Sequence, residues 1–112
     1  YHDPCQISRR GGATQDARYL LEGFAKDFRE MTPAADYNWC CGGGGGVQAM
    51  GRAADLRHKV FKMKIDQVAK TGAETMVSSC ANCRLTMDES KEYWKWKGGL
   101  DSLVEVIAAH LE

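Results

Sequence analysis

The sequence predicts a small α/β domain in which a short parallel sheet is flanked by helices. Segments with strand character alternate with amphipathic helical segments, which is the pattern of a layered, mainly parallel α/β unit. Glycine or proline marks most of the junctions between these segments. A length of 112 residues is that of one domain, so residues 1–112 are expected to form a single unit, the C-terminal fragment of a larger subunit.

In the first half of the chain the pattern predicts a strand end, a helix and a second short strand. Residues 1–3 have strand character and precede a proline, which cannot continue a ladder of strand hydrogen bonds. A threonine cap followed by apolar residues at helical spacing predicts a helix over 14–28. A short strand is expected over 28–31, and residues 36–39 then lead into a loop of cysteines and glycines.

The second half is predicted to alternate more regularly. A broad apolar stripe predicts the longest helix over 52–71, and the glycine that follows is placed to end it. Residues 74–79 have the β-branched character of a strand and run into a further helix that ends near Ser90. The aromatic-rich segment 93–97 is expected to be another strand, and the apolar spacing predicts an amphipathic helix over 100–111.

Five cysteines are the main anomaly, and they fall in suggestive places in this plan. Cys5 and Cys80 each follow a predicted strand, and open α/β sheets bind ligands beyond the carboxyl ends of their strands. Cys40 and Cys41 open a run of five glycines, whose backbone can approach a bound group closely. An odd number of cysteines fits disulfide pairing poorly and favours a reducing compartment.

The cysteine pattern favours a metal–sulfur site, with the loop at the carboxyl ends of the strands. Thiolates bind soft metals, and iron–sulfur clusters are held mainly by thiolates. The Cys80-x-x-Cys83 pair at a strand-to-helix junction places two sulfurs on neighbouring positions, and glycine backbone can direct N–H groups at an anionic core. Five sulfurs exceed by one the needs of a tetrahedral zinc site or a cubane cluster.

At the level of local sequence the chain resembles the CCG (cysteine-rich) domain of heterodisulfide-reductase-like proteins, over essentially its whole length. The segments that carry this resemblance are His2-Asp3-Pro4-Cys5, Cys41-Gly42-Gly43-Gly44-Gly45, Thr71-Gly72-Ala73-Glu74 and Ser79-Cys80-Ala81-Asn82-Cys83. Within that family it looks most like the catalytic iron–sulfur subunits of membrane redox complexes, such as the K subunit of the complex associated with dissimilatory sulfite reductase.

The resemblance implies an iron–sulfur oxidoreductase subunit with a noncubane [4Fe-4S] cluster. The implied ligands are Cys5, Cys40, Cys41, Cys80 and Cys83, and the implied cofactor-binding residues around them are Gly42, Gly43, Gly44, Gly45 and Asn82. The implied reaction reduces or forms a disulfide or trisulfide of a small thiol or a sulfur-carrier protein. Membrane-bound or soluble electron-transfer subunits are the implied partners, in the cytoplasm, with membrane association through those partners.

Several residues admit a simpler interpretation. His2 is either a proton donor to a departing thiolate or a histidine packed at a strand end. Asp3 is expected to form a turn, His58 and His110 to lie at the surface, and the basic residues of 52–70 to form a solvated helix face or to attract an anionic partner. Arg9 and Arg10 are candidates for binding a substrate carboxylate or sulfonate.

Two whole-domain alternatives remain at this level. Four of the cysteines could hold zinc, or the Cys80–Cys83 pair could act alone as a thioredoxin-like redox pair. In either a zinc-bound or a disulfide-stapled form, the domain would be a structural module that docks a partner subunit. The balanced charge, 15 basic and 15 acidic residues, argues against nucleic-acid binding, and no apolar run approaches the roughly 20 residues of a membrane span.

Overall fold

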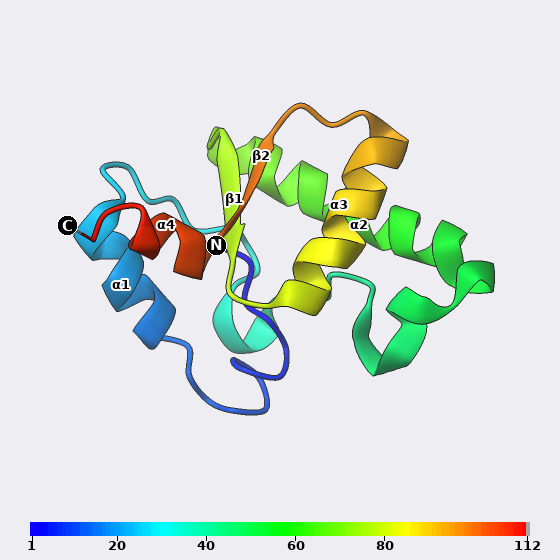
Figure 1. Ribbon diagram of the computed structural model, residues 1–112, viewed down its shortest axis with the longest axis horizontal. Coiled ribbons are helices and arrows are strands. Elements are labelled where there is room, and N and C mark those ends of the chain that lie inside the picture. Colours follow the sequence, from blue (N-terminus) through cyan, green and yellow to red (C-terminus); the bar gives the residue numbers. More distant parts are fainter. Residues whose placement is uncertain (112) are drawn as a thin grey trace.

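The structure, a computed structural model, describes residues 1–111 and has the α/β architecture that the sequence predicts (Figure 1). Along the chain the elements are α1 (Asp16–Phe24), η1 (Ala35–Tyr37), η2 (Gly44–Ala49), η3 (Gly51–Ala53), α2 (Ala54–Thr71), β1 (Thr75–Ser78), α3 (Ala81–Trp94), β2 (Gly99–Ser102) and α4 (Leu103–Ala108), where η denotes a short 3₁₀ segment. None of the helices within the described residues is both long and apolar enough to cross a membrane.

The sheet consists of β1 and β2, which are parallel and are joined by the α3 crossover. The register pairs Thr75 with Gly99 and Ser78 with Ser102. An isolated parallel bridge joins His2 to Ser78, and the His2 amide donates to the Val77 carbonyl at 2.8 Å. The carboxyl ends of β1 and of the His2 segment therefore lie at the same edge, where a ligand site is expected in a parallel sheet.

The two faces of the sheet bury separate sets of side chains. On one face, Met76 and Leu100 pack beneath α2 and α3, together with Phe61, Val68, Met87, Met31 and two cysteines, Cys41 and Cys83. On the other face, Val77 packs with Tyr1, Ala17, Leu21 and Leu103, between α1 and α4. Figure 1 shows these two helix pairs on opposite sides of the sheet. Each large apolar side chain buried in this way contributes roughly 1.5–3 kcal/mol.

Two helix boundaries have clear local causes. Gly72, in the left-handed conformation at φ 71°, ends α2 as the sequence predicts. Cys80 is the N-cap of α3, because its Sγ accepts a hydrogen bond from the Cys83 amide at 3.4 Å. The sulfur atom of Cys80 therefore caps this helix in the way that a side-chain oxygen caps most helices.

Three of the predicted elements are wrong. Residues 93–97 are not a strand, because α3 continues to Trp94 and Trp96 packs edge-on against Phe61 of α2, with ring centroids 5.8 Å apart. Residues 100–111 do not form one helix: the segment begins as β2 and becomes helical only at α4. Residues 28–31 form no strand. In each case tertiary packing overrides local pattern, since one residue of the segment, Trp96, Leu100 or Met31, packs in the core beneath α2 and α3.

Candidate metal centre

The cysteine–glycine loop, residues 40–46, lies against both α2 and α3. A Cβ atom at Gly42 would lie 3.2 Å from the Cβ of Val60 on α2, and its φ of +97° is one that side chains rarely permit. A Cβ atom at Gly43 would lie 2.1 Å from Thr86 Oγ1 on α3, far inside van der Waals contact. Bare main chain at these two positions is therefore what lets the loop approach both helices.

The remaining loop residues divide into tethered and open positions. Asn82, in the first turn of α3, donates from Nδ2 to the Gly43 carbonyl at 3.3 Å and so ties the loop to the helix. Gly44 and Gly45 begin η2, and no protein atom lies within 4 Å of where their Cβ atoms would be. The close approach expected along the glycine run is thus found at its first two members, whereas the next two border open space.

Two of the five cysteines, Cys41 and Cys83, meet His2 in the interior, and Cys40 and Cys80 belong to the same two segments. The ligand atoms of His2, Cys41 and Cys83 all lie within 4.8 Å of one another, and all three residues are buried. Cys40 precedes Cys41 directly, and its Sγ accepts a hydrogen bond from the Gly42 amide at 3.2 Å. Cys80 lies next to this group in the chain, and its Sγ accepts a hydrogen bond from the Cys83 amide at 3.4 Å. The predicted convergence of the cysteine–glycine loop with the Cys-x-x-Cys segment is therefore present in the fold.

Cys5 is the fifth predicted ligand. Within residues 1–111 its sulfur makes no hydrogen bond to another cysteine and is not part of the His2, Cys41 and Cys83 group. His2 and Ser78 are bridge partners at the edge of the sheet. Cys5 comes three positions after His2, and Cys80 comes two positions after Ser78, so both cysteines lie just beyond that edge. Cys5 is half-buried and, like the other four cysteines, is a free thiol. Its place beyond the same sheet edge keeps Cys5 a candidate ligand, and five-cysteine ligation stays a prediction.

Burial and the contacts among the sulfurs disfavour negative charge on the loop thiols in the absence of a metal. The hydrogen bond with Cys41, together with burial, raises the pKa of Cys40 far above the ordinary thiol range. A hydrogen bond with Cys40 lowers the pKa of Cys41, but the bond with Cys83 and burial outweigh it and bring the value to about 11. Backbone amides already point at these sulfurs, with Gly42 donating to Cys40 at 3.2 Å and Gly43 to Cys41 at 3.4 Å. A bound metal would take the place of the thiol protons and receive the same amide contacts.

His2 carries the clearest sign that a ligand belongs here. Its side chain is 1% exposed, and neither Nδ1 nor Nε2 has a hydrogen-bond partner in the described part of the chain. Burial, with a smaller effect of the Lys64 ammonium, lowers the pKa of His2 to about 3, so the ring is neutral. A buried polar group without a partner costs roughly 1–3 kcal/mol. The residues present therefore fit a metal or cluster that would accept a ligand or hydrogen bond from this ring.

Asp3 does not simply form a turn, as was expected, but anchors the segment that carries His2. Its carboxylate is 1% exposed and accepts two hydrogen bonds from the Arg18 guanidinium, each at 2.8 Å, and a third from the Ala35 amide. Burial raises the pKa of Asp3, but the Arg18 and Ala35 hydrogen bonds outweigh burial and hold the pKa below its usual value. Arg18 also pairs with Glu30. This pair fixes the N-terminal segment to α1.

Lys64 on α2 is a buried charged residue close to the candidate centre that sequence reasoning missed. It is fully buried and donates from Nζ to Asn38 Oδ1 at 2.7 Å, whereas the sequence placed it on a solvated basic face. Burial lowers the pKa of Lys64 to about 8, opposed by Asp3 and by the cysteines of the loop. The signal was present in the spacing, because Lys64 falls at i+3 from Phe61 and i−4 from Val68, on the buried stripe.

The other charged candidates are structural. Arg57 is buried, pairs with Glu89 and donates to the Val47 and Met50 carbonyls, so it holds the segment after the glycine run. His58 is buried rather than at the surface, because its ring stacks on Tyr93.

His110 is exposed, as predicted. Arg9 donates to the Asp36 and Asn38 carbonyls, and Arg10 is exposed.

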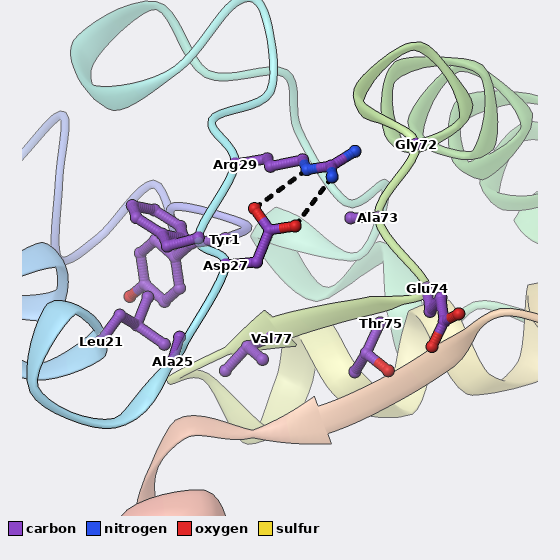
Figure 2. A pocket seen from close by; sticks show the side chains of 11 residues that line it. Tyr1, Leu21, Ala25, Asp27, Arg29, Gly72, Ala73, Glu74, Thr75 and Val77 are labelled. Atoms are coloured by element: carbon purple, nitrogen blue, oxygen red, sulfur yellow. Dashed lines mark hydrogen bonds and ion pairs between the residues drawn. The ribbon is translucent and has the colours of Figure 1, made fainter.

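A cavity of about 500 Å³ lies elsewhere, on the α1 side of β1 (Figure 2). It is bordered by Tyr1, Phe28, Thr75 and Val77, and by the ion pair of Arg29 with Asp27. None of the cysteines lines it. Cys41 and Cys83 pack with Met76, whereas the cavity borders Val77, so the candidate centre and the cavity lie on different faces of β1.

Comparison with known sequences identifies the class of domain that has this fold and this set of thiols. The chain belongs to the cysteine-rich (CCG) domain family, whose sequence profile matches residues 1–88.

Relatives of the chain include the D subunit of dihydromethanophenazine:CoB–CoM heterodisulfide reductase from Methanosarcina barkeri, 29% identical in an alignment of 112 positions that covers 99% of this chain and 27% of that protein. The Hdr-like menaquinol oxidoreductase iron-sulfur subunit 2 of Archaeoglobus fulgidus is 32% identical over 101 residues, 85% of this chain and 18% of that protein. The B subunit of the fumarate reductase (CoM/CoB) of Methanothermobacter marburgensis is 30% identical over 93 residues, 82% of this chain and 18% of that protein. No solved structure matches significantly.

By their names these homologues are oxidoreductase subunits, of a heterodisulfide reductase, an Hdr-like oxidoreductase and a fumarate reductase, and the second is an iron–sulfur subunit. The chain spans 27% or less of the length of these curated relatives. What this chain assembles with and acts on is therefore left to the proposal below.

Proposed function

We propose that this domain binds a [4Fe-4S] cluster of noncubane type and serves as the cluster-binding part of a heterodisulfide-reductase-like subunit. The proposed ligands are Cys5, Cys40, Cys41, Cys80 and Cys83. The observation that supports it most strongly is the meeting of His2, Cys41 and Cys83 within 4.8 Å, with both imidazole nitrogens buried and without a partner among the described residues. Protein interiors rarely leave such groups unpaired without a ligand in view.

The cluster would supply one-electron transfer, and the surrounding residues would hold and adjust it. Backbone amides of residues 42–44 point at the sulfurs of Cys40 and Cys41 and would stabilise negative charge on the core. Asn82 would keep the glycine loop against α3 through its bond to Gly43. His2, neutral and buried, would donate one N–H to a sulfur of the site or to a departing thiolate, a role we assign to it as a catalytic candidate.

The proposed reaction is the reduction, or in reverse the formation, of a disulfide or trisulfide of a small thiol or of a sulfur-carrier protein. For a disulfide, two electrons and two protons are taken up as the S–S bond breaks, and two thiols are released. The Methanosarcina relative is a heterodisulfide reductase subunit, which supports this class of substrate. We further propose electron-transfer subunits as partners, of the kind that serve the K subunit of the sulfite-reductase-associated complex, and a cytoplasmic location.

A zinc site is the second candidate, and one specific observation favours it. Histidine and cysteine are the usual ligands of structural zinc, and a spread of ligand atoms within 4.8 Å suits a single ion. In that case the domain would be a structural module that docks a partner subunit.

Anaerobic reconstitution with iron and sulfide, followed by Mössbauer and EPR spectroscopy, separates the two candidates. About four irons and a cluster signal per chain would support the redox proposal. One tightly held zinc per chain, with no labile sulfide and no cluster signal, would support the structural module and refute the cluster.

A further inference from the structure

A lysine ammonium is buried next to the candidate metal centre and is inaccessible to solvent. Lys64 is 0% exposed, and its Nζ donates to a neutral acceptor, the amide oxygen of Asn38, at 2.7 Å. Asn38 is itself buried and donates from Nδ2 to the Asp3 carbonyl, next to His2. Burying a charge in this way costs several kcal/mol unless an opposite charge compensates it.

The protein itself compensates this charge incompletely. The Asp3 carboxylate acts on Lys64 electrostatically, but its oxygens already accept from Arg18 and from the Ala35 amide, and it makes no hydrogen bond to Nζ. Lys64 lies between Phe61 and Val68 on the buried face of α2, and these two residues pack in one cluster with Cys41 and Cys83. The sulfurs of this cluster and of Cys40 also act on the ammonium electrostatically. Negative charge on these sulfurs is therefore what the position of the lysine would favour.

We propose that Lys64 is the fixed counter-charge of the metal–sulfur centre, where it raises the reduction potential by stabilising the added electron. This inference rests on the proposed cluster. Lys64 acts through the cluster and does not touch substrate, because it has no exposed surface. Exposed basic residues of α2, such as Lys62, would contribute little to the potential, since water screens their charge.

The test compares two matched substitutions on the same helix. Lys64→Met removes the buried charge and keeps most of the chain volume, whereas Lys62→Met removes an exposed charge that pairs with Asp66. Lys64→Gln is a second neutral variant whose amide can still donate to Asn38. Each protein is reconstituted anaerobically with iron and sulfide, its iron content is measured, and its reduction potential is read by EPR during a titration with dithionite.

We expect both neutral Lys64 variants to retain iron and to have a reduction equilibrium constant lowered about tenfold or more, which is roughly 59 mV per tenfold for one electron. Lys62→Met should have the wild-type potential. Loaded Lys64 variants with an unchanged potential would overturn the inference and leave the proposed function standing. If both neutral variants fail to fold, Lys64 has a structural role, and the inference is overturned in that case too. Failure of the wild-type protein to bind iron and sulfide would refute the proposed function, and the inference would fall with it.

Discussion

The contact between the glycine loop and α3 makes a substitution at Gly43 the most informative perturbation of the fold. In Gly43→Ala, the new Cβ would lie 2.1 Å from Thr86 Oγ1, 3.0 Å from its Cβ and 3.2 Å from its Cγ2. Thr86 cannot easily turn away, because it is fully buried and its hydroxyl donates to the Asn82 carbonyl at 3.0 Å. The loop would therefore have to retreat, and Cys41 would move with it.

The expected cost of this one methyl group is that of overpacking a closed core, about 1–3 kcal/mol in the free energy of unfolding. A second and larger effect is expected on metal binding, since the retreat of the loop separates Cys41 from Cys83. Gly44→Ala is the matched control, because no protein atom lies within 4 Å of the position its Cβ would take. That variant should be as stable as wild type, to within about 0.5 kcal/mol.

The assay is urea denaturation of the metal-free protein together with the iron content of the reconstituted protein. Adding Thr86→Ala to Gly43→Ala removes two of the three crowding atoms and should recover part of both losses, which a double-mutant cycle would record as coupling between the two positions. Equal stability and equal iron content for Gly43→Ala and Gly44→Ala would refute the reasoning, because close backbone approach would then have no consequence.

Three further predictions concern residues around the same site. Cys41→Ala should abolish or transform the EPR signal of the reconstituted cluster, and an unchanged spectrum would exclude Cys41 as a ligand. His2→Phe should raise the melting temperature of the metal-free protein, because two unpartnered buried nitrogens are removed at a saving of roughly 1–3 kcal/mol, and should lower metal affinity; a fall in metal-free stability would contradict the idea that the ring awaits a ligand. Asp3→Asn should cost about 3–5 kcal/mol, since it leaves the Arg18 guanidinium without its buried partner. Because the pKa of Asp3 is lower in the folded state, its contribution is present above the ordinary carboxyl pKa and is lost as pH falls through the folded value. The difference in unfolding free energy between wild type and Asp3→Asn should therefore shrink in acid, and a difference that does not depend on pH would be evidence against the ion pair.

The α/β class and the meeting of the glycine loop with the Cys80–Cys83 segment were predictable because they depend on regular features. Strand-to-helix alternation and the direction of a parallel sheet place Cys80 beyond β1, and a loop with so many glycines has few other uses. The helix over 54–71 and its glycine stop follow from spacing and from the left-handed backbone at Gly72.

The details that failed depend on partners distant in sequence. Nothing local distinguishes β2 from the first turn of a helix, because Leu100 suits both and only its pairing with Met76 decides. The burial of Lys64 was readable from its place on the apolar stripe, but a basic residue is normally assigned to solvent, and its acceptor, Asn38, lies 26 residues away. The role of Asp3 likewise needed the knowledge that α1 brings Arg18 across it.

The central claim is that sulfur atoms from separate segments assemble around one inorganic core. The iron and acid-labile sulfide content of the protein, purified anaerobically without reconstitution, tests it most directly. We predict about four irons, with a matching amount of sulfide, for each chain. A single zinc ion without sulfide, or no metal at all under conditions that keep every thiol reduced, would contradict it.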